Sequence, residues 1–334
     1  MEEKIKIHLS KEVYSTLLKD CEAFEFYKNN GELNKNAFLS KLINNYYLSY
    51  QDKENVLITL IEKELKEEVK DYKELTLRIV NKLNKLTSSP NKEKFSTIIS
   101  FKPTKDTQMA LSYVEKYLLN QTGLSEFFRN MFTSYCSLPQ DQREKIIFKN
   151  QYETLLKAIR ENKKVFFTTK YGKDSTHESS PYSITMSKEE LHCYLLTKYN
   201  NKCKTYRLNR IEEVTIINEP RDLDEENIKL FEKMIEHGPQ FTYEDNEEII
   251  IVKLTEKGKQ LYKSHYVHRP NVDFIEGDYY YFSCSHVHIK TYFRRFGKEA
   301  YIVSPYSLQK DFIKFYRKAE ESYIENGRLK KGEK

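Results

Sequence analysis

Cysteine is scarce in this sequence, and its spacing carries no motif. In a chain of this length, scattered cysteines argue against a disulfide framework and are typical of reduced thiols in the cytosol. The 334 residues contain five, without a CxxC pair: Cys21, Cys136, Cys193, Cys203 and Cys284.

Long apolar runs are also missing. The opening residues, MEEKIKIHLS, contain no apolar core of the kind found in signal peptides, and no later run is long enough to span a bilayer. We therefore expect a cytoplasmic protein that has no membrane partner.

The sequence lacks the common motifs of catalysis. It contains neither a Gly-rich phosphate loop nor a nucleophile elbow. Acidic pairs such as Glu247 and Glu248, or Asp273 and Glu276, have no accompanying nuclease motif, and such runs are usually solvated. We expect a protein that is not an enzyme.

Histidine and cysteine come close together near the C-terminal end. Cys284, His286 and His288 alternate as they would on one face of a strand, and His265 and His268 lie upstream. Nitrogen and sulfur ligands at that spacing suit Zn²⁺, but there is no second spaced pair of cysteines. We expect neither a metal nor another cofactor.

Tryptophan is absent, whereas tyrosine and charge are abundant. The 26 tyrosines supply amphipathic rings, many of which we expect to pack in the core or on the surface. The net charge of +6, from 56 basic and 50 acidic side chains, is only mildly positive. Any affinity for nucleic acid must therefore come from a local patch.

An internal repeat organises the N-terminal half. Residues 4–18 alternate like a strand and then follow a helical pattern after Ser10, and residues 97–114 show the same sequence of patterns. A second helix follows in each copy, and residues 124–135 match residues 39–50 at five of twelve positions. Two copies of one β-α-α unit are the best interpretation.

This unit resembles the ribbon-helix-helix domain. Two such units pair their strands antiparallel, and the resulting ribbon enters the major groove of DNA. Because both copies lie in one chain, they can pair within the molecule. Outward lysines also prevent aggregation of edge strands, so a scaffold that has lost DNA binding is an equal alternative. The candidate DNA contacts are Lys4, Lys6 and His8 from the first copy and Lys102 from the second, where Ile98 and Ser100 are poor anchors.

The segment between the two copies, residues 52–86, contains no Gly or Pro. Apolar side chains recur at 4-3 spacing from Leu65 to Leu86, which predicts a long helix with one apolar stripe. A coiled-coil arm is the alternative, but the stripe is short.

Strand-like runs follow an amphipathic helix within residues 137–164. They predict a small, curved, SH3-like barrel. In the last run, Arg207 and Arg210 lie three residues apart on an alternating strand, where a half-buried cation is costly to desolvate. The runs are 164–172, 182–186, 191–200 and 205–217.

Residues from about 150 to 325 resemble WYL-domain proteins. The run HCYLL stands where the name-giving Trp-Tyr-Leu falls, and KTYRLNRI stands at the family's Phe-Arg-Leu-Asp-Arg-Ile run. Cys193 and Asn209 depart from the Trp and the Asp, whereas Tyr194 and Leu195 keep the other two letters. The change to Cys193 removes a large aromatic surface that could support packing or a ligand.

The resemblance implies that the barrel binds a nucleic acid or a nucleotide-like ligand. Arginine forks suit phosphates and base edges, and tyrosine rings stack on bases. The alternative is that the tyrosines are core residues and that the arginines pair with Glu212 and Glu213. The candidate site residues are Tyr182, His192, Tyr194, Lys204, Tyr206, Arg207 and Arg210.

Residues 292–316 resemble the extension that usually follows a WYL domain, which implies a helix, a Phe-Gly turn, a short strand, a proline and a helix. We expect a homodimer in which this extension supplies much of the interface, because aromatic residues and arginines are enriched at interface cores. The aromatic residues that we expect to be exposed are Tyr279, Tyr280, Tyr281, Tyr292, Phe293 and Phe296.

Two functions from different classes remain open. Ribbon-helix-helix units joined to a WYL domain resemble the accessory proteins of type VI-D CRISPR systems, which implies binding of single-stranded RNA (or DNA) and stimulation of a CRISPR effector nuclease. The alternative is a transcriptional regulator whose ribbon binds operator DNA and whose WYL domain senses a ligand. The second ribbon strand has few candidate DNA contacts, which slightly favours the accessory role over the transcriptional regulator.

The predicted fold class is α+β: a mostly helical tandem ribbon-helix-helix region, a central SH3/Sm-like small β-barrel and a C-terminal α/β extension. The expected segments are a first unit (1–50), a connecting helix (51–92), a second unit (93–138), a linker helix (139–163), the WYL domain (164–220), a linker (221–245) and the extension (246–325).

Overall fold

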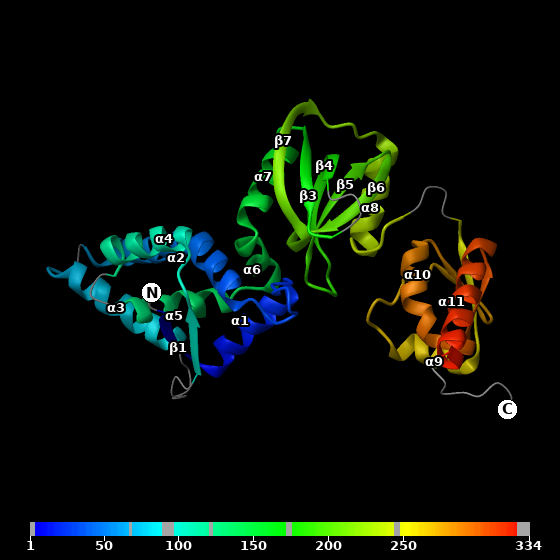
Figure 1. The fold of residues 1–334 in the computed structure, drawn as a ribbon, viewed down its shortest axis with the longest axis horizontal. Coiled ribbons are helices and arrows are strands. Elements are labelled where there is room, and N and C mark those ends of the chain that lie inside the picture. Colours follow the sequence, from blue (N-terminus) through cyan, green and yellow to red (C-terminus); the bar gives the residue numbers. More distant parts are fainter. Residues whose placement is uncertain are drawn as a thin grey trace. The chain divides into compact units, whose positions relative to one another are not determined.

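The computed structural model describes residues 4–66, 69–88, 97–119, 123–171, 176–243 and 248–325. The described chain is α+β, with helices and three antiparallel sheets of two, five and four strands (Figure 1). It divides into two compact units, Met1–Tyr152 and Glu153–Lys334.

The first unit is built around a two-stranded sheet. Strand β1 (Ile5–Leu9) pairs antiparallel with β2 (Thr97–Phe101), so the two copies of the repeat pair within one chain. Alternation buries Ile7, Leu9, Ile99 and Phe101 on the inner face. Each strand is followed by two helices.

Side-chain caps begin the first helix of each copy, as predicted. Ser10 accepts a hydrogen bond from the Val13 amide, and Thr104 accepts one from the Thr107 amide. The helices of this unit are α1 (Lys11–Ala23), α2 (Lys35–Leu65), α3 (Tyr72–Ser88), α4 (Lys105–Tyr117), α5 (Leu124–Cys136), α6 (Gln140–Ile147) and the start of α7 (Lys149–Arg160).

The prediction of one helix over residues 52–86 is wrong. Helix α2 runs on from the repeat as far as Leu65, and the separate helix α3 begins at Tyr72. Helix α3 contacts both α2 and α5, and it buries Thr76 and Val80. The 4-3 stripe is therefore divided between two helices, because packing of α3 against its neighbours outweighs the continuous helical pattern.

A buried ion pair fastens α1 to α5 and α6. Arg143 donates to both carboxylate oxygens of Asp20, from Nε at 2.7 Å and from a terminal nitrogen at 2.9 Å. The Tyr135 hydroxyl donates to the same carboxylate at 2.8 Å. Only 2% of the Asp20 side chain and 13% of the Arg143 side chain are exposed, so the carboxylate depends on these donors.

The second unit begins with a five-stranded antiparallel sheet in the order β6-β5-β4-β3-β7. The prediction of a single strand over residues 205–217 is wrong. A 3₁₀ turn, η1 (Leu208–Arg210), separates β6 from β7, so Arg207 and Arg210 do not share one strand. The strands are β3 (Lys163–Thr169), β4 (Thr176–Met186), β5 (Cys193–Tyr199), β6 (Lys202–Arg207) and β7 (Ile211–Pro220).

Helix α8 (Glu225–His237) covers one face of this sheet. Its Phe231 and Met234 pack in one cluster with Tyr194, Leu196 and Cys203 from β5 and β6. The helix begins with a capping box at Asp224. One face of strands β5 and β6 therefore lies against α8, and their other face is turned away from this helix.

The C-terminal extension is a second small α/β fold. A four-stranded antiparallel sheet has the order β11-β8-β10-β9, and Gly297 makes the predicted Phe-Gly turn with a positive φ of 56°. The predicted helix, turn, strand and final helix are all present. The elements are β8 (Ile250–Leu254), α9 (Glu256–Ser264), β9 (Phe274–Glu276), β10 (Tyr279–Phe282), α10 (His286–Phe293), η2 (Arg294–Glu299), β11 (Ala300–Ser304) and α11 (Tyr306–Glu325).

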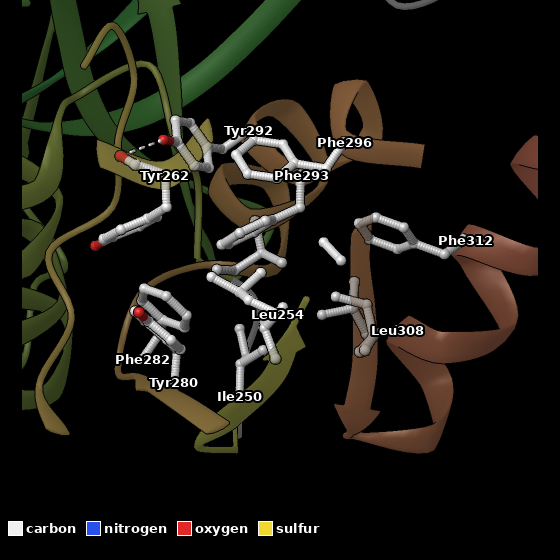
Figure 2. Close-up of a cluster of buried hydrophobic side chains, with 14 of the residues drawn as sticks. Ile250, Leu254, Tyr262, Tyr280, Phe282, Tyr292, Phe293, Phe296, Leu308 and Phe312 are labelled. Atoms are coloured by element: carbon white, nitrogen blue, oxygen red, sulfur yellow. Dashed lines mark hydrogen bonds between the residues drawn. The ribbon is translucent and has the colours of Figure 1, made fainter. Parts of the chain in front are cut away.

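The expected exposure of four aromatic residues in this extension is wrong. Tyr280, Tyr292, Phe293 and Phe296 are not exposed; they lie in the buried core between the sheet and the helices (Figure 2). They are at most 6% exposed, so they give no support to a dimer interface. The reason is that Tyr280 lies on the inner face of β10, Tyr292 and Phe293 on the inner side of α10, and Phe296 in η2 against the same core.

The alternating Cys284, His286 and His288 do not lie on a strand. Ser285 caps α10, which begins at His286, so the three side chains do not share a strand face. Within the described residues, no group of three or more His, Cys, Asp or Glu side chains is arranged to hold a metal ion. Among the described helices, none is both long and apolar enough to cross a bilayer.

Candidate functional site

Arg207 lies in a polar triad on the α8 face of the sheet. Because Arg207 pairs with Tyr194 across β6 and β5, their side chains lie on the same face. The guanidinium donates to the Tyr194 hydroxyl at 2.9 Å and to Glu190 at 2.6 Å, and the Tyr194 hydroxyl also donates to Glu190. Arg207 is therefore bound by groups of its own domain.

The carboxylate of Glu190 holds this triad together. Burial raises the pKa of Glu190, but the hydrogen bonds from Tyr194 and Arg207 outweigh it and leave the pKa below its usual range. Burial, followed by the hydrogen bond to Glu190, raises the pKa of Tyr194 well above its usual value. At neutral pH, the triad thus contains a carboxylate, a neutral phenol and a guanidinium.

The alternative in which Arg207 pairs with Glu212 or Glu213 is not found among the described residues. Glu190, in the turn between β4 and β5, takes that place. The sequence gives only a weak indication of the pairing between Arg207 and Glu190, because the two residues lie seventeen positions apart. It becomes a partner only when β5 pairs with β6 and brings the turn beside the end of β6.

Tyr206 lies on the opposite face, because successive side chains of a strand alternate. Its ring packs edge-on against Phe167, with centroids 5.0 Å apart, and its hydroxyl lies 3.4 Å from Nδ1 of His177. His177 also contacts Tyr199 edge-on at 4.8 Å. Burial raises the pKa of Tyr206 to about 12, so the phenol remains neutral.

Two cations border this second face. The Lys204 ammonium lies 4.9 Å from the Tyr199 ring centroid, and the Arg210 guanidinium lies 5.8 Å from that of Tyr171. Both distances suit cation–π contacts. Arg210 and Tyr171 are exposed, and Tyr199, Lys204 and Tyr206 are partly exposed. Hydrogen bonds connect the part of this face near Tyr199 with the part near Tyr171.

The connecting hydrogen bonds run through Thr169. Its hydroxyl lies 3.2 Å from Nε2 of the buried His177 and donates to the Tyr171 carbonyl at 3.1 Å. The Lys170 amide donates to the Arg210 carbonyl at 2.9 Å. We call the resulting surface the Tyr206 face: Tyr171, Tyr199, Lys204, Tyr206 and Arg210.

A polar cavity adjoins the Tyr206 face at Tyr199. It has a volume of about 460 Å³ and is also lined by Lys164, Lys198 and Asn200. Lys164 is held by Glu178 and Glu219, and Lys198 by Asp222 and Asp224. Both lysines of the cavity therefore already have carboxylate partners.

The structure thus divides the predicted site residues between two faces. Tyr182 stacks on Phe231, with centroids 4.9 Å apart, and belongs with Tyr194 and Arg207 on the α8 side. His192 is buried beside the start of β5, where its carbonyl accepts from the Ser187 amide at 2.9 Å. Lys204, Tyr206 and Arg210 come together on the other side.

Sequence reasoning missed three members of this region. Tyr171, His177 and Tyr199 belong to no shared motif, and Tyr199 is separated from the other two by most of β4 and β5. Pairing of β3 with β4 and of β5 with β6 brings them beside Tyr206. The richness in tyrosine was the only available signal, and it does not separate surface rings from core rings.

The candidate DNA contacts lie on the outer side of the two-stranded sheet. Lys6 stands opposite Ser100 and His8 opposite Ile98, and all four are exposed. Lys4 precedes β1. Lys102 follows β2, where its amide and carbonyl are both hydrogen-bonded to the Asn36 side chain. The ribbon therefore presents cations on one copy and mostly uncharged side chains on the other.

Comparisons with known proteins agree with this domain structure. The family model for the WYL domain matches residues 150–216. A search of curated proteins finds no match. A solved structure described as a CRISPR Cas-related protein is similar over 98% of this chain and 95% of its own, with 21% sequence identity and a TM-score of 0.69.

A second solved structure, the proteasome accessory factor B/C of Arthrobacter aurescens, covers 68% of this chain and 37% of its own, with 12% identity and a TM-score of 0.26. The first likeness shows that the CRISPR Cas-related protein and this chain share a fold over nearly their whole lengths. The family match is confined to the helix α7 and the strands that carry both faces described above. Residues 150–216 therefore form a WYL domain.

Proposed function

We propose that this chain is a CRISPR-associated accessory factor that binds single-stranded RNA at the Tyr206 face and stimulates an effector nuclease. The observation that carries the proposal is the grouping of three tyrosine rings with Lys204 and Arg210 on one surface. Aromatic rings offer stacking to any base, and cations contact the phosphates between them. The geometry requires no paired strand in the ligand.

The strand order supports this assignment. Five strands in the order β6-β5-β4-β3-β7, with a 3₁₀ turn before the last, are the basis on which we infer a small SH3/Sm-like barrel. Another small five-stranded barrel, the OB-fold, binds oligonucleotides on a strand face. The likeness to a CRISPR Cas-related protein over nearly the whole chain supports the CRISPR association.

A titration of labelled single-stranded RNA tests the binding part of the proposal. Tyr171→Ala with Arg210→Ala should weaken binding by about tenfold or more, because one stack and one phosphate contact are lost. Arg317→Ala removes an exposed cation of α11 and serves as the control. Unchanged binding by the double variant would show that the RNA lies elsewhere.

A cleavage assay tests the accessory part. Adding the full chain to a type VI-D effector with its guide should raise the rate of RNA cleavage, and the Tyr171→Ala/Arg210→Ala variant should raise it less. If the wild-type chain binds RNA but leaves the cleavage rate unchanged, the effector role is wrong while the binding role stands.

The second candidate function is transcriptional regulation. We infer that the paired β-α-α units are ribbon-helix-helix units, since β1 and β2 form an antiparallel ribbon and each is followed by two helices. The exposed Lys6 and His8 favour a ribbon that contacts duplex DNA. Binding of duplex from the protein's own promoter, with weaker binding of single-stranded RNA, would favour this candidate over the first.

A further inference from the structure

The four-stranded sheet of the extension has one covered face and one open face. Helices and the core residues of Figure 2 cover the inner face, which includes Val252, Tyr280 and Ile302. The neighbours of these residues along each strand point the opposite way. They form the open face: Ile251, Lys253, Phe274, Tyr279, Tyr281, Tyr301 and Val303.

A row of alternating rings and charge crosses three strands of the open face. Lys253 in the inner strand β8 stands opposite Tyr279 of β10 on one side and opposite Tyr301 of β11 on the other. Its ammonium lies 5.5 Å from the Tyr279 ring centroid. Tyr279 is 37% exposed and Tyr301 is 56% exposed, so both rings meet solvent.

The open face is hollowed beside this row. A cavity of about 660 Å³ is lined by Tyr279, Tyr281, Ile251 and Val303. Its remaining lining comes from the β9–β10 turn, residues 276–278. A space of this size accommodates a flat ring system the size of a nucleobase with its sugar.

The two carboxylates at the edge of the cavity already have partners. Asp278 accepts from the Lys259 ammonium at 2.7 Å, and Glu276 accepts from the Tyr281 hydroxyl at 3.2 Å. The Lys259 ammonium lowers the pKa of Asp278 below its usual value. The Lys253 ammonium also lowers the pKa of Asp278, but no ion pair within 4 Å joins it to a carboxylate among the described residues. It is the cation that the row of rings offers to a ligand.

We propose that the open face is a second binding surface for single-stranded nucleic acid, on which bases stack against Tyr279 and Tyr301 while Lys253 contacts the phosphate between them. Exposed aromatic side chains on a four-stranded sheet bind two or three RNA bases in this manner. The inference rests on the proposed function for its ligand class but on a different surface for its evidence.

A second copy of the chain fits the open face less well. A flat protein partner would desolvate Lys253 on an inner strand of the sheet, which is costly without a facing carboxylate. The carboxylates at the edge of the cavity, Glu276 and Asp278, already accept from Tyr281 and Lys259. A nucleic acid supplies phosphate to Lys253 and flat rings to the tyrosines at the same time.

The test is a titration of the full chain with labelled oligouridine. Tyr279→Ala with Tyr301→Ala should weaken binding by about tenfold or more, whereas Tyr279→Phe with Tyr301→Phe should retain it, because stacking needs the ring and not the hydroxyl. Lys253→Gln should lower the log–log salt slope by roughly 0.7. The matched control is Tyr306→Ala with Tyr323→Ala, which removes two exposed tyrosines of α11.

A crosslinking experiment gives a readout that does not depend on affinity. Irradiation of the complex with a 4-thiouridine oligonucleotide should place a crosslink on the segment that contains Tyr279. If crosslinks occur only in the WYL domain and the Tyr279→Ala/Tyr301→Ala variant binds like wild type, the inference fails while the proposed function stands. Failure of the wild-type chain to bind RNA at all would overturn both.

Light scattering tests whether a second copy of the chain, rather than RNA, covers the open face. If Tyr279→Ala with Tyr301→Ala converts a dimer into a monomer while RNA affinity is unchanged, the open face is a contact between copies and the inference is wrong. An unchanged oligomeric state together with weakened RNA binding is the expected result.

Discussion

At the residue scale, two arginines that look equivalent in the sequence have different environments. Arg207 donates to Glu190 and Tyr194 of its own domain, and 24% of its side chain is exposed. Arg210 is exposed at the end of η1 and lies against the ring of Tyr171. The carboxylate on Arg207 occupies the place that a phosphate would need.

We therefore expect the two arginines to respond differently to substitution. Arg210→Ala should weaken single-stranded RNA binding and lower the log–log salt slope by roughly 0.7, the value for one phosphate contact. Arg207→Ala should weaken binding less and should destabilise the domain, because Glu190 loses its cationic partner. Binding and urea titrations of both variants measure this difference. A larger binding loss for Arg207→Ala would show that the ligand displaces Glu190.

His288 makes the stability of the extension depend on pH. Burial lowers the pKa of His288 from its ordinary 6.5 to about 4, against its hydrogen bond to the His268 carbonyl and with small contributions from His237 and His268. Phe241 stacks on the ring, with centroids 3.9 Å apart. The folded state therefore holds a neutral imidazole where the unfolded chain takes up a proton.

Low pH destabilises the folded state through His288, because the imidazole takes up a proton in the unfolded chain more readily than in the folded one. Stability from this group is fully present above pH 6.5 and is lost as the pH falls towards 4, by up to roughly 3 kcal/mol. His288→Phe should remove this part of the pH dependence, and His288→Gln should do so while retaining a hydrogen-bond donor. Urea unfolding at pH 7 and pH 4.5 gives the comparison. Equal pH dependence in wild type and both variants would contradict the assignment.

At the element scale, one buried carboxylate joins three helices of the first unit. Asp20 lies on α1 and receives hydrogen bonds from Tyr135 on α5 and Arg143 on α6. No part of the sequence pattern indicates this triad, because Asp20 lies more than a hundred residues from both of its donors. Its role is to hold the first copy of the repeat against the second.

Breaking this ion pair should be costly. Arg143→Met leaves an unpaired buried carboxylate, and we expect a loss of about 3–5 kcal/mol in the stability of the first unit. Asp20→Leu together with Arg143→Met should recover much of that loss, since both charges are removed. Hydrogen exchange of the α1 and α5 amides locates the effect. Lys28→Ala, at an exposed ion pair with Glu32, should change little.

At the scale of the whole molecule, the ribbon and the WYL domain belong to separate compact units. Separate sites should respond to substitution almost additively. Lys4→Ala with Lys6→Ala should reduce binding of duplex DNA if the ribbon is a DNA reader, and should leave RNA binding by the WYL domain intact. Paired titrations against duplex DNA and single-stranded RNA at fixed salt measure both. Equal losses on both ligands would mean that ribbon and WYL domain form one surface.

The sequence alone determined much of the local structure. Alternation in residues 4–9 and 97–101 placed Ile7 and Ile99 inward, and Ser10 and Thr104 were recognisable as helix caps. The WYL run and the order of elements in the extension were also readable. These features depend on neighbours within a few residues, whose geometry follows from backbone periodicity and capping.

Tertiary structure decided which of these residues share a surface. Whether a tyrosine is core or surface depends on the face that packing covers, so Tyr280 is buried while Tyr279 beside it is exposed. The break at η1 placed Arg207 and Arg210 in different surroundings, and strand pairing brought Glu190 to one of them. Long-range pairing determines these contacts, because burial and charge partners come from residues that no local pattern connects.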